Sequence, residues 1–354
     1  MDYFCSPNCT SIFVKHSNIL LIMKKFFTTL ALAFAALCGG AQAQEQSSKG
    51  EVILTLFEHV GVNYNLDNKD WSHPGFNMER AYLGYRYHFD PNWSATVIYD
   101  ASESNGMNTA HGFVKNAFVQ YKNDKLTVMA GIVPTEQGLA AERCWGYRYV
   151  NKAFYDMNGW GASADMGVAV KYRFTDWFSA DLWMMNGEGF KYLQLDNHYL
   201  YALGLNFKPM EGLDMRLYAD VKTVDDGLYM APQENVSLFA GYDHELFRVG
   251  AEFNVQNNVG CFEDYGMTGI SVFGTYKASP KMNIFCRYDH GSSSDNNGND
   301  FINWRSPSDG QMAMLGMEYR MNKLVSLAPA IRYTADGNGN NRKLYAFLSA
   351  KVSL

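Results

Sequence analysis

Residues 246–256 read LFRVGAEFNVQ, and this stretch decides the fold. Phe247, Val249, Ala251, Phe253 and Val255 are apolar, and the residues between them are polar or glycine. Strict alternation over about ten residues predicts a β-strand with one apolar and one polar face. Residues 213–222, LDMRLYADVK, repeat the pattern. About ten residues is also the length that a tilted strand needs to cross a bilayer.

The alternation recurs from Glu51 to the end of the chain and predicts sixteen strands. Their expected ranges are 51–63, 77–89, 93–101, 112–122, 125–133, 164–174, 176–186, 198–207, 213–223, 235–243, 246–256, 266–277, 281–290, 310–321, 324–335 and 342–353. The last range carries one continuous apolar face from Leu344 to Leu354. We expect it to pair with the first strand, because closing the sheet removes its free edges.

The expected connections alternate between short and long. Tight turns such as Asp90-Pro91-Asn92, Asn123-Asp124 and Asn322-Lys323 follow every second strand. Longer polar connections lie between them, at 64–76, 257–265 and 291–309. Membrane barrels join their strands by short periplasmic turns and long extracellular loops. The fold class predicted is therefore all-β, a transmembrane antiparallel up-and-down β-barrel of about sixteen strands.

The N-terminal region has the layout of a secretory signal. Lys24 and Lys25 precede an uncharged apolar run from Phe26 to Leu37, and Ala41-Gln42-Ala43 supplies small residues for cleavage. We expect 1–22 to be a start-site extension, 23–43 a cleaved signal peptide and 44–354 the barrel, exported to the outer membrane. A lipid anchor at Cys38 is the alternative, but Leu37 is bulky where such a site requires a small residue.

The remaining composition argues against several function classes. The formal net charge is −6 and no basic run is present, so nucleic acid is a poor partner. Cys144, Cys261 and Cys286 remain after the expected cleavage and contain no CxxC pair, which leaves free thiols or at most one bridge. No HExxH or GxSxG motif occurs. We expect no metal, no cofactor and no catalytic residues.

Four segments carry a family resemblance. They are 145–150 (WGYRYV), 163–167 (SADMG), Asp176-Trp177 and 186–190 (NGEGF). With them the chain resembles the outer-membrane porins that are distantly allied to the phosphate-selective porins O and P, over about Glu51 to Leu354. The resemblance implies a sixteen-stranded barrel that can assemble as a homotrimer. The phosphate-selective members carry dense ladders of Arg and Lys, and no comparably dense run occurs here, so strict phosphate selectivity is not expected.

The longest connection, from Pro134 to Ser163, follows the fifth expected strand. In general porins the third extracellular loop has this position and folds into the lumen. We therefore predict an inward-folded constriction loop, since long ordered loops are usually functional, and a loop that covers the barrel mouth is the alternative. Charges and aromatic rings suit a narrow passage in which each charge acts strongly. The candidate constriction residues are Glu136, Glu142, Arg143, Trp145, Arg148 and Asp156.

The polar faces of the expected strands supply candidate pore-lining charges. The cations are Arg80, Arg86, Lys171, Arg173, Arg216, Lys222, Arg248, Arg287, Arg320 and Arg332, and the anions are Asp181, Asp214, Asp220, Glu252, Asp289 and Glu318. Within single strands we expect five neutralising pairs, namely Asp214–Arg216, Asp220–Lys222, Arg287–Asp289, Glu318–Arg320 and Arg248–Glu252. Asp181 is expected to offset part of the charge of Lys171 and Arg173.

Three arginines, Arg80, Arg86 and Arg332, are left without a partner on their own strand. The small positive surplus predicts a weak preference for anions. Glu136, Glu142 and Asp156 of the loop could reduce it by facing Arg80 and Arg86 across the opening.

These patterns predict a porin for passive diffusion of small hydrophilic solutes and ions. The expected surroundings are outer-membrane lipids and lipopolysaccharide, small polar solutes or anions, the barrel-assembly machinery and a homotrimer. Two alternatives stay open: a barrel whose surface loops act as a receptor or adhesin, and an outer-membrane hydrolase built from scattered residues.

Overall fold

The computed structural model describes residues 49–103, 110–194, 196–225, 230–295, 309–337, 339 and 341–354. The expected start-site extension, 1–22, and the expected signal peptide, 23–43, lie outside the described residues.

The described part of the chain contains sixteen strands in sequence order. They are β1 (Gly50–Asn65), β2 (Asp70–His88), β3 (Trp93–Glu103), β4 (Ala110–Lys122), β5 (Leu126–Pro134), β6 (Ala164–Arg173), β7 (Phe178–Met185), β8 (Leu200–Phe207), β9 (Leu213–Lys222), β10 (Gln233–Asp243), β11 (Phe247–Asn257), β12 (Gly266–Ser279), β13 (Met282–Ser294), β14 (Gly310–Arg320), β15 (Val325–Asp336) and β16 (Lys343–Ser353). Two short helices, α2 (Leu139–Trp145) and α3 (Phe154–Met157), follow β5, and a 3₁₀ turn, η1 (Val259–Cys261), follows β11.

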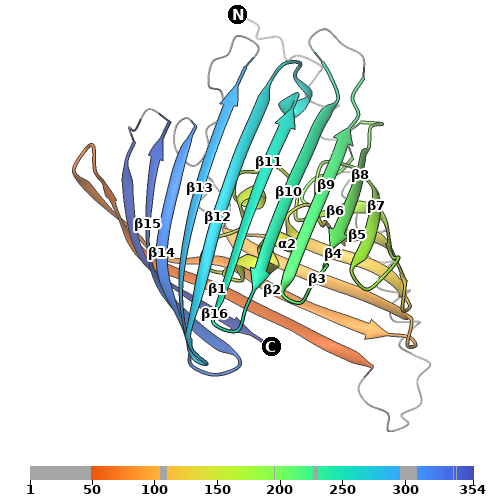
Figure 1. Ribbon diagram of the computed structural model, residues 1–354, viewed down its shortest axis with the longest axis horizontal. Coiled ribbons are helices and arrows are strands. Elements are labelled where there is room, and N and C mark those ends of the chain that lie inside the picture. Colours follow the sequence, from red (N-terminus) through yellow and green to blue (C-terminus); the bar gives the residue numbers. More distant parts are fainter. Residues whose placement is uncertain are drawn as a thin grey trace, which may run out of the picture. The chain divides into compact units, whose positions relative to one another are not determined.

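The strands form one closed antiparallel barrel, as predicted (Figure 1). Each strand pairs with its neighbours in sequence, and β16 returns to β1 with Val60 opposite Leu348 and Leu56 opposite Val352. Closure gives both edges of the sheet a hydrogen-bonded partner, which is the condition for strands to stand in an apolar medium.

The two faces of the barrel wall differ in character. On β11, Glu252 and Asn254 are 4% and 1% exposed, whereas Phe253 between them is 43% exposed. The same alternation runs through β12 and β13, where Ile270, Val272 and Ile284 are exposed. We call the side that carries Glu252 the polar face and the side that carries Phe253 the apolar face.

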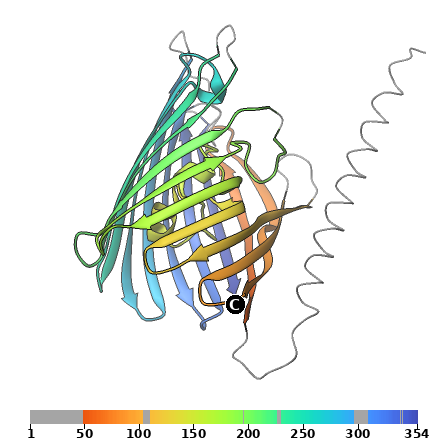
Figure 2. The same ribbon diagram turned by 90° about the vertical axis from the view of Figure 1, so that its right-hand side faces the viewer.

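The connections follow the predicted rhythm with one exception. The turns after β2, β4, β6, β8, β10, β12 and β14 are short, and most of the other connections are longer (Figure 2). The prediction of a loop over 64–76 is wrong, because β2 begins at Asp70 and pairs with Asn65 of β1. Asn65 Oδ1 accepts hydrogen bonds from the backbone N–H groups of Asp67 and Asn68 and so closes a tight turn.

Aromatic rings gather on the apolar face beside the short turns. Tyr85, Phe89 and Trp93 at the first short turn are between 39% and 45% exposed. Tyr172 and Phe174 at the third contact each other with ring centroids 4.9 Å apart. None of the helices within 49–354 that the structure describes is long and apolar enough to span a membrane.

Candidate functional site

The segment from Thr135 to Ser163 joins β5 to β6 and contains α2 and α3. Ala140, Ala141 and Glu142 favour the helical conformation of α2. The helix ends at Gly146, whose φ of 74° lies in the left-handed region that glycine adopts without strain. Both helices are short, so packing rather than helical propensity fixes them. We call residues 135–163 the loop segment.

A cationic side chain organises the loop segment from within. Arg148 Nη1 donates to Glu142 Oε2 at 2.5 Å and to Asp156 Oδ2 at 2.6 Å, and its Nη2 donates to Tyr82 Oη of β2 at 3.3 Å. Burial alone would raise the pKa of the Asp156 carboxyl, but attraction by Arg148 and Lys152 outweighs it and holds that pKa below its ordinary value. The cluster ties three parts of the segment to one another and to the barrel wall.

Polar-face side chains of β11, β13, β14 and β15 hold the loop segment through hydrogen bonds. The donor–acceptor pairs are Arg248 Nη2 to Trp145 O (2.9 Å), Arg287 Nη1 to Lys152 O (2.6 Å), Arg332 Nη1 to Asn151 Oδ1 (3.1 Å), Tyr149 Oη to Glu318 Oε1 (3.0 Å) and Phe154 N to Glu252 Oε1 (3.3 Å). On the side of β6, Lys171 forms an ion pair with Glu136. The arginines therefore satisfy carbonyl oxygens of an irregular backbone, which would otherwise be costly to bury.

Apolar packing supplies a second attachment. Trp145 is fully buried, with its ring centroid 5.5 Å from that of Phe273 and 5.6 Å from that of Phe285. Tyr147 stacks on Phe285 at 4.4 Å. The same cluster contains polar-face residues of β1 and β14 to β16, namely Phe57, Met312, Met314, Ala328, Ala330 and Phe347. On these strands apolar side chains occupy positions of the polar face, and the loop segment covers them.

Cys144 packs against the edge of this apolar cluster. Its Sγ donates to Val249 O of β11 at 3.5 Å. Burial raises the pKa of the Cys144 thiol to about 11. Cys261 and Cys286 are free thiols as well, so no disulfide joins the three cysteines.

Two of the five predicted charge pairs are present. Arg287 donates to both oxygens of Asp289, at 2.7 Å and 2.6 Å, and Arg320 Nε lies 3.0 Å from Glu318 Oε2. In the other three pairs the partners are wrong. Arg216 bonds Asp181, Asp214 bonds Lys208, Lys222 bonds Glu188, Asp220 bonds Asn235, and Arg248 and Glu252 both bond the loop segment.

The physical reason is reach. Residues two apart on one strand stand roughly 6.6 Å apart, whereas directly opposite residues on neighbouring strands stand about 4.5–5.5 Å apart. Asp220 and Asn235 are directly opposite each other. Arg216 reaches Asp181 two strands away because Gly204 between them has no side chain. Asp214 and Lys222 find Lys208 and Glu188 in the neighbouring connections.

The arginines expected to lack partners on their own strand have partners elsewhere. Arg80 forms a buried ion pair with Asp100 of β3. Arg86 Nη1 lies 3.4 Å from Glu51 Oε2, and its Nε donates to Thr96 Oγ1 at 3.2 Å. The expected offset of Lys171 and Arg173 by Asp181 is wrong, since Lys171 pairs with Glu136 and Arg173 donates to Asp124 O. Glu136 pairs with Lys171, and Glu142 and Asp156 pair with Arg148, so none of the three forms an ion pair with Arg80 or Arg86.

Among the predicted constriction residues, Arg143 stands apart. It is exposed, whereas Trp145 is fully buried and Glu136 is nearly so. No ion pair of Arg143 occurs within the residues that the structure describes.

Several residues that matter here escaped the sequence analysis. Lys115 Nζ donates to Ser163 Oγ at 3.2 Å, and Lys351 Nζ lies over the ring of Tyr149. The apolar seat of the loop segment was also missed. A signal for it exists in the sequence, because 312–314 and 328–330 are apolar on both strand faces.

Described residues form no group of three or more His, Cys, Asp or Glu side chains suited to a metal ion.

Comparison of the sequence with protein-family models and with curated proteins gives no match. Solved structures do match, at low sequence identity. The barrel has the fold of bacterial outer-membrane porins. OprB of Pseudomonas putida aligns with a TM-score of 0.65 and 14% identity, over 86% of this chain and 94% of that chain. OmpF of Salmonella typhi aligns with a TM-score of 0.63 and 12% identity, over 89% of this chain and 100% of that chain. An anion-selective porin from Comamonas acidovorans aligns with a TM-score of 0.61 and 11% identity, over 87% of this chain and 100% of that chain.

Proposed function

We propose that this chain is an outer-membrane porin through which small hydrophilic solutes and ions diffuse passively. The observation that carries the proposal is that the wall of the closed barrel has one exposed apolar face and one buried polar face. Exposed Val, Leu, Ile and aromatic side chains cover the apolar face, while Asp, Glu, Asn and Arg stand buried on the polar face. A lipid-facing outer surface with a hydrated lumen requires this arrangement. The proposed role is diffusion and not catalysis.

The loop segment is proposed to fold into the lumen and narrow it. Its contacts with β2, β6 and β11 to β15, all made to polar-face side chains, support this placement. The proposed constriction is then bounded by the Arg148 cluster and by the charges of the wall. In such a passage a charge acts at short range and with little screening.

A weak anion preference is proposed from the charges that remain without an opposite charge. Lys115, Lys191, Arg248 and Lys351 have no ion-pair partner within the described residues. Asp165, Asp220 and Glu252 are buried carboxylates that accept hydrogen bonds from neutral groups, namely backbone N–H groups, Asn235 and Asn254. Four cations against three carboxylates leave a small positive surplus, so discrimination should be modest.

Assembly and location complete the proposal. The barrel would stand among outer-membrane lipids and lipopolysaccharide after export and insertion by the barrel-assembly machinery. A homotrimer is proposed from the resemblance to porins that can assemble in this way, and native electrophoresis with the mass of the detergent-solubilised particle tests it.

Ion conductance of the purified, refolded protein in planar bilayers tests the proposed function. Stepwise current increases of uniform size are expected, together with a boiled and an unboiled form that migrate differently in electrophoresis. A folded, inserted barrel that carries no current and admits no solute in liposome swelling would overturn the proposal.

A further inference from the structure

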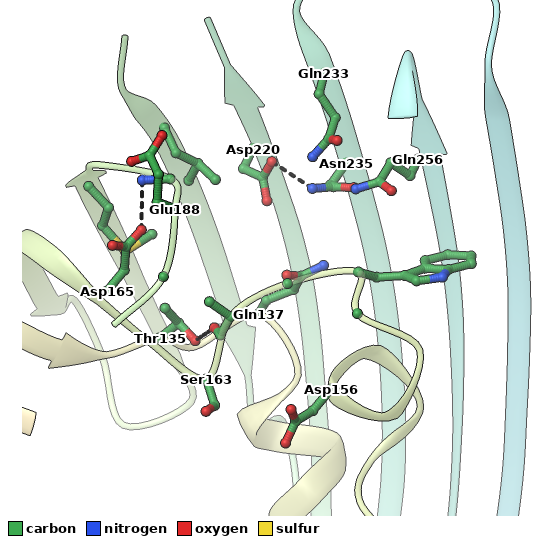
Figure 3. A pocket seen from close by; sticks show the side chains of 18 of the residues that line it. Thr135, Gln137, Asp156, Ser163, Asp165, Glu188, Asp220, Gln233, Asn235 and Gln256 are labelled. Carbon is green, nitrogen blue, oxygen red and sulfur yellow. Dashed lines mark hydrogen bonds between the residues drawn. The ribbon is translucent and has the colours of Figure 1, made fainter. Parts of the chain in front are cut away.

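A cavity of about 760 Å³ lies between the loop segment and the connection that follows β7. Asp156 and Ser163 of the loop segment line it on one side, apart from Asp165, Glu188 and Asp220, as Figure 3 shows. Cavities of about 300–1,000 Å³ are the size range of small-molecule sites. Cationic and aromatic side chains meet on the side of Ser163, and they indicate what the cavity can bind.

Two lysines come together at the ring of Phe190, which belongs to the connection after β7 and lines the cavity. Lys115 Nζ of β4 lies 5.7 Å from the centre of that ring, and Lys191 Nζ lies 5.8 Å from it. Lys191 is exposed and lines the cavity, whereas Lys115 is half-buried behind it. A solute in the cavity can therefore contact the side chain of Lys191 directly.

Neither ammonium group has a carboxylate partner within the described residues. Lys115 Nζ donates to Tyr82 Oη at 3.4 Å and to Ser163 Oγ at 3.2 Å, and both acceptors are neutral. Lys191 Nζ forms no hydrogen bond in the described part of the chain and lies 5.2 Å from the ring centre of Phe113. Since an ammonium group carries three N–H donors, Lys191 can offer them to a solute.

The carboxylates nearest these lysines are held by arginines. Asp100 forms its ion pair with Arg80, and Glu142 and Asp156 share Arg148. With the two lysines, four cations stand against three carboxylates. The excess of positive charge therefore lies on the lysines.

The surroundings of Lys191 favour a bound anion. Partial burial of its ammonium group lowers the pKa of Lys191, and repulsion by Arg80 and Lys115 lowers it further against the attraction of Asp100 and Asp156. Like charges held together in a partly buried place repel one another, and an anion bound between them relieves this repulsion. The arrangement suits a solute with a single negative charge.

The carboxylates on the other side of the cavity do not reverse this attraction. Glu188 forms an ion pair with Lys222. Asp165 accepts hydrogen bonds from two backbone N–H groups, and Asp220 accepts one from Asn235. Asp165 and Asp220 are only 3% and 7% exposed, so a solute meets little of either side chain.

Aromatic rings adjoin the cationic group. Phe190 and Tyr192 flank Lys191 in the sequence, both line the cavity, and Tyr192 is 70% exposed. Exposed rings give a flat apolar surface on which an aromatic solute can stack. An inorganic anion such as phosphate has no apolar surface to place against them. A positive charge beside flat rings therefore fits an organic anion with an aromatic body.

We propose that this side of the cavity is a binding subsite for a small aromatic carboxylate. Lys191 donates to the carboxylate, Lys115 adds attraction at short range, and the rings of Phe190 and Tyr192 pack against the aromatic body. The inference rests on the proposed porin function and names a solute class of that pore. It places part of the proposed anion preference between β4 and the connection after β7.

The test measures single-channel current in planar bilayers, at fixed ionic strength, during titration with benzoate, benzamide, acetate and phosphate. Benzamide has the ring without the charge, acetate has the charge without the ring, and phosphate is inorganic. Saturation-transfer NMR on the detergent-solubilised protein, with protein-free micelles as the blank, measures binding of the three organic probes without relying on conductance. Benzoate should reduce the current saturably and bind more tightly than the other probes.

Two substitutions remove the recognising groups. Lys191→Gln removes the charge and keeps a side chain of similar length, and Phe190→Leu removes the ring and keeps an apolar side chain. Lys191→Gln should weaken benzoate binding by about tenfold, the loss typical of one hydrogen bond to a charged group, and should change benzamide binding little. Phe190→Leu should weaken benzoate binding by about threefold and leave acetate binding unchanged.

Matched controls lie outside the cavity. Lys281→Gln removes a charge at an exposed short turn, and Phe174→Leu alters an exposed ring at another. Lys351→Gln removes a lysine of the polar face that lies over Tyr149, and so separates a local site from a general loss of positive charge. All three should bind benzoate as the parent protein does in the NMR measurement. The heat-dependent gel shift confirms that each variant has inserted.

The outcomes separate the two proposals. Normal conductance with no saturable benzoate effect in either measurement overturns the subsite and leaves the porin standing. Benzoate binding in a barrel that carries no current supports the subsite and overturns the porin. Binding of benzamide, acetate or phosphate as tight as that of benzoate overturns the solute class. Equal losses in Lys191→Gln and Lys351→Gln overturn the assignment of residues.

Discussion

Arg216 of β9 and Asp181 of β7 form a doubly hydrogen-bonded ion pair across the intervening strand β8. The two N–O distances are 2.7 Å and 2.8 Å, and both side chains are 1% exposed. The pair is possible because Gly204 of β8 stands between them. A Cβ at Gly204 would lie 2.3 Å from Arg216 Nη2 and 2.3 Å from Asp181 Oδ1.

Gly204→Ala should push this ion pair apart. The expected loss is about 1–3 kcal/mol of unfolding free energy, the usual cost of overfilling a packed site. Gly274→Ala is the matched control, because a Cβ there would meet no atom nearer than 3.8 Å. Denaturant unfolding of both variants in detergent micelles measures the difference, and equal stabilities would contradict the account of Gly204.

The strands were predictable from the sequence because their signal is local. Period-two alternation predicted a strand over 246–256, and the observed strand runs from Phe247 to Asn257. It also predicted that the last strand pairs with the first, as it does. The start of β2 was missed because Pro74 and Gly75 interrupt its alternation, and β-bulges follow Phe57 and Gly61 of its partner.

The site was predictable only in outline, because its contacts are non-local. The length and position of the connection after β5 indicated a functional loop, but its partners come from strands more than a hundred residues away. The pairing of Arg216 with Asp181 depends on a glycine in a third strand. The apolar seat formed by Met312 and Phe347 appears only when the strands are assembled.

Gly269→Val should displace the loop segment from its seat. A Cβ at Gly269 of β12 would lie 2.1 Å from the ring of Phe154. Displacement of α3 should make the channel current larger and noisier while the barrel still inserts. Gly274→Ala again serves as the control on the same strand. An inserted Gly269→Val barrel with the parent's conductance would show that Phe154 is not held there.

Cys144 should report the same displacement chemically. Its thiol has a pKa of about 11 and lies against β11, so a water-soluble thiol reagent at pH 8 should label it slowly in the parent barrel. Labelling should accelerate in Gly269→Val. In a chain that starts at Gln44, replacing Cys261 and Cys286 with Ser leaves Cys144 as the sole thiol, and Cys144→Ser gives the background. Rapid labelling of the parent would contradict the packing of α2.

Acid should loosen the loop segment through Asp156. The pKa of this carboxyl is lowered in the folded protein, so the stability it contributes is present above the unfolded value of about 3.9 and is lost as pH falls through the lowered folded value. In the parent channel the part of the acid response that comes from Asp156 should therefore occur only below about pH 3.9. In Arg148→Gln the charge that lowers the pKa is gone, so the current should change at higher pH. Identical pH profiles for the two channels would refute this role of Arg148.

The sign of selectivity can be tested at Lys351, which lies over Tyr149 without an ion-pair partner in the described residues. The parent should show a small zero-current potential of the anion-selective sign across a KCl gradient. Lys351→Glu should shift the potential towards cation selectivity. Lys323→Glu, at an exposed short turn, introduces the same charge change away from the loop segment and should shift it much less. A clear cation preference in the parent would contradict the proposed excess of positive charge in the pore.

The central claim is that residues 135–163 narrow a diffusion pore, and the single-channel conductance of a shortened loop tests it most directly. The variant replaces 143–156 with a brief Gly-Ser linker, which deletes Arg148 and Asp156 together with the buried ring of Trp145. The heat-dependent gel shift confirms that the barrel has inserted. The account predicts a clear rise in conductance over the parent channel, and an unchanged conductance in an inserted barrel would contradict it.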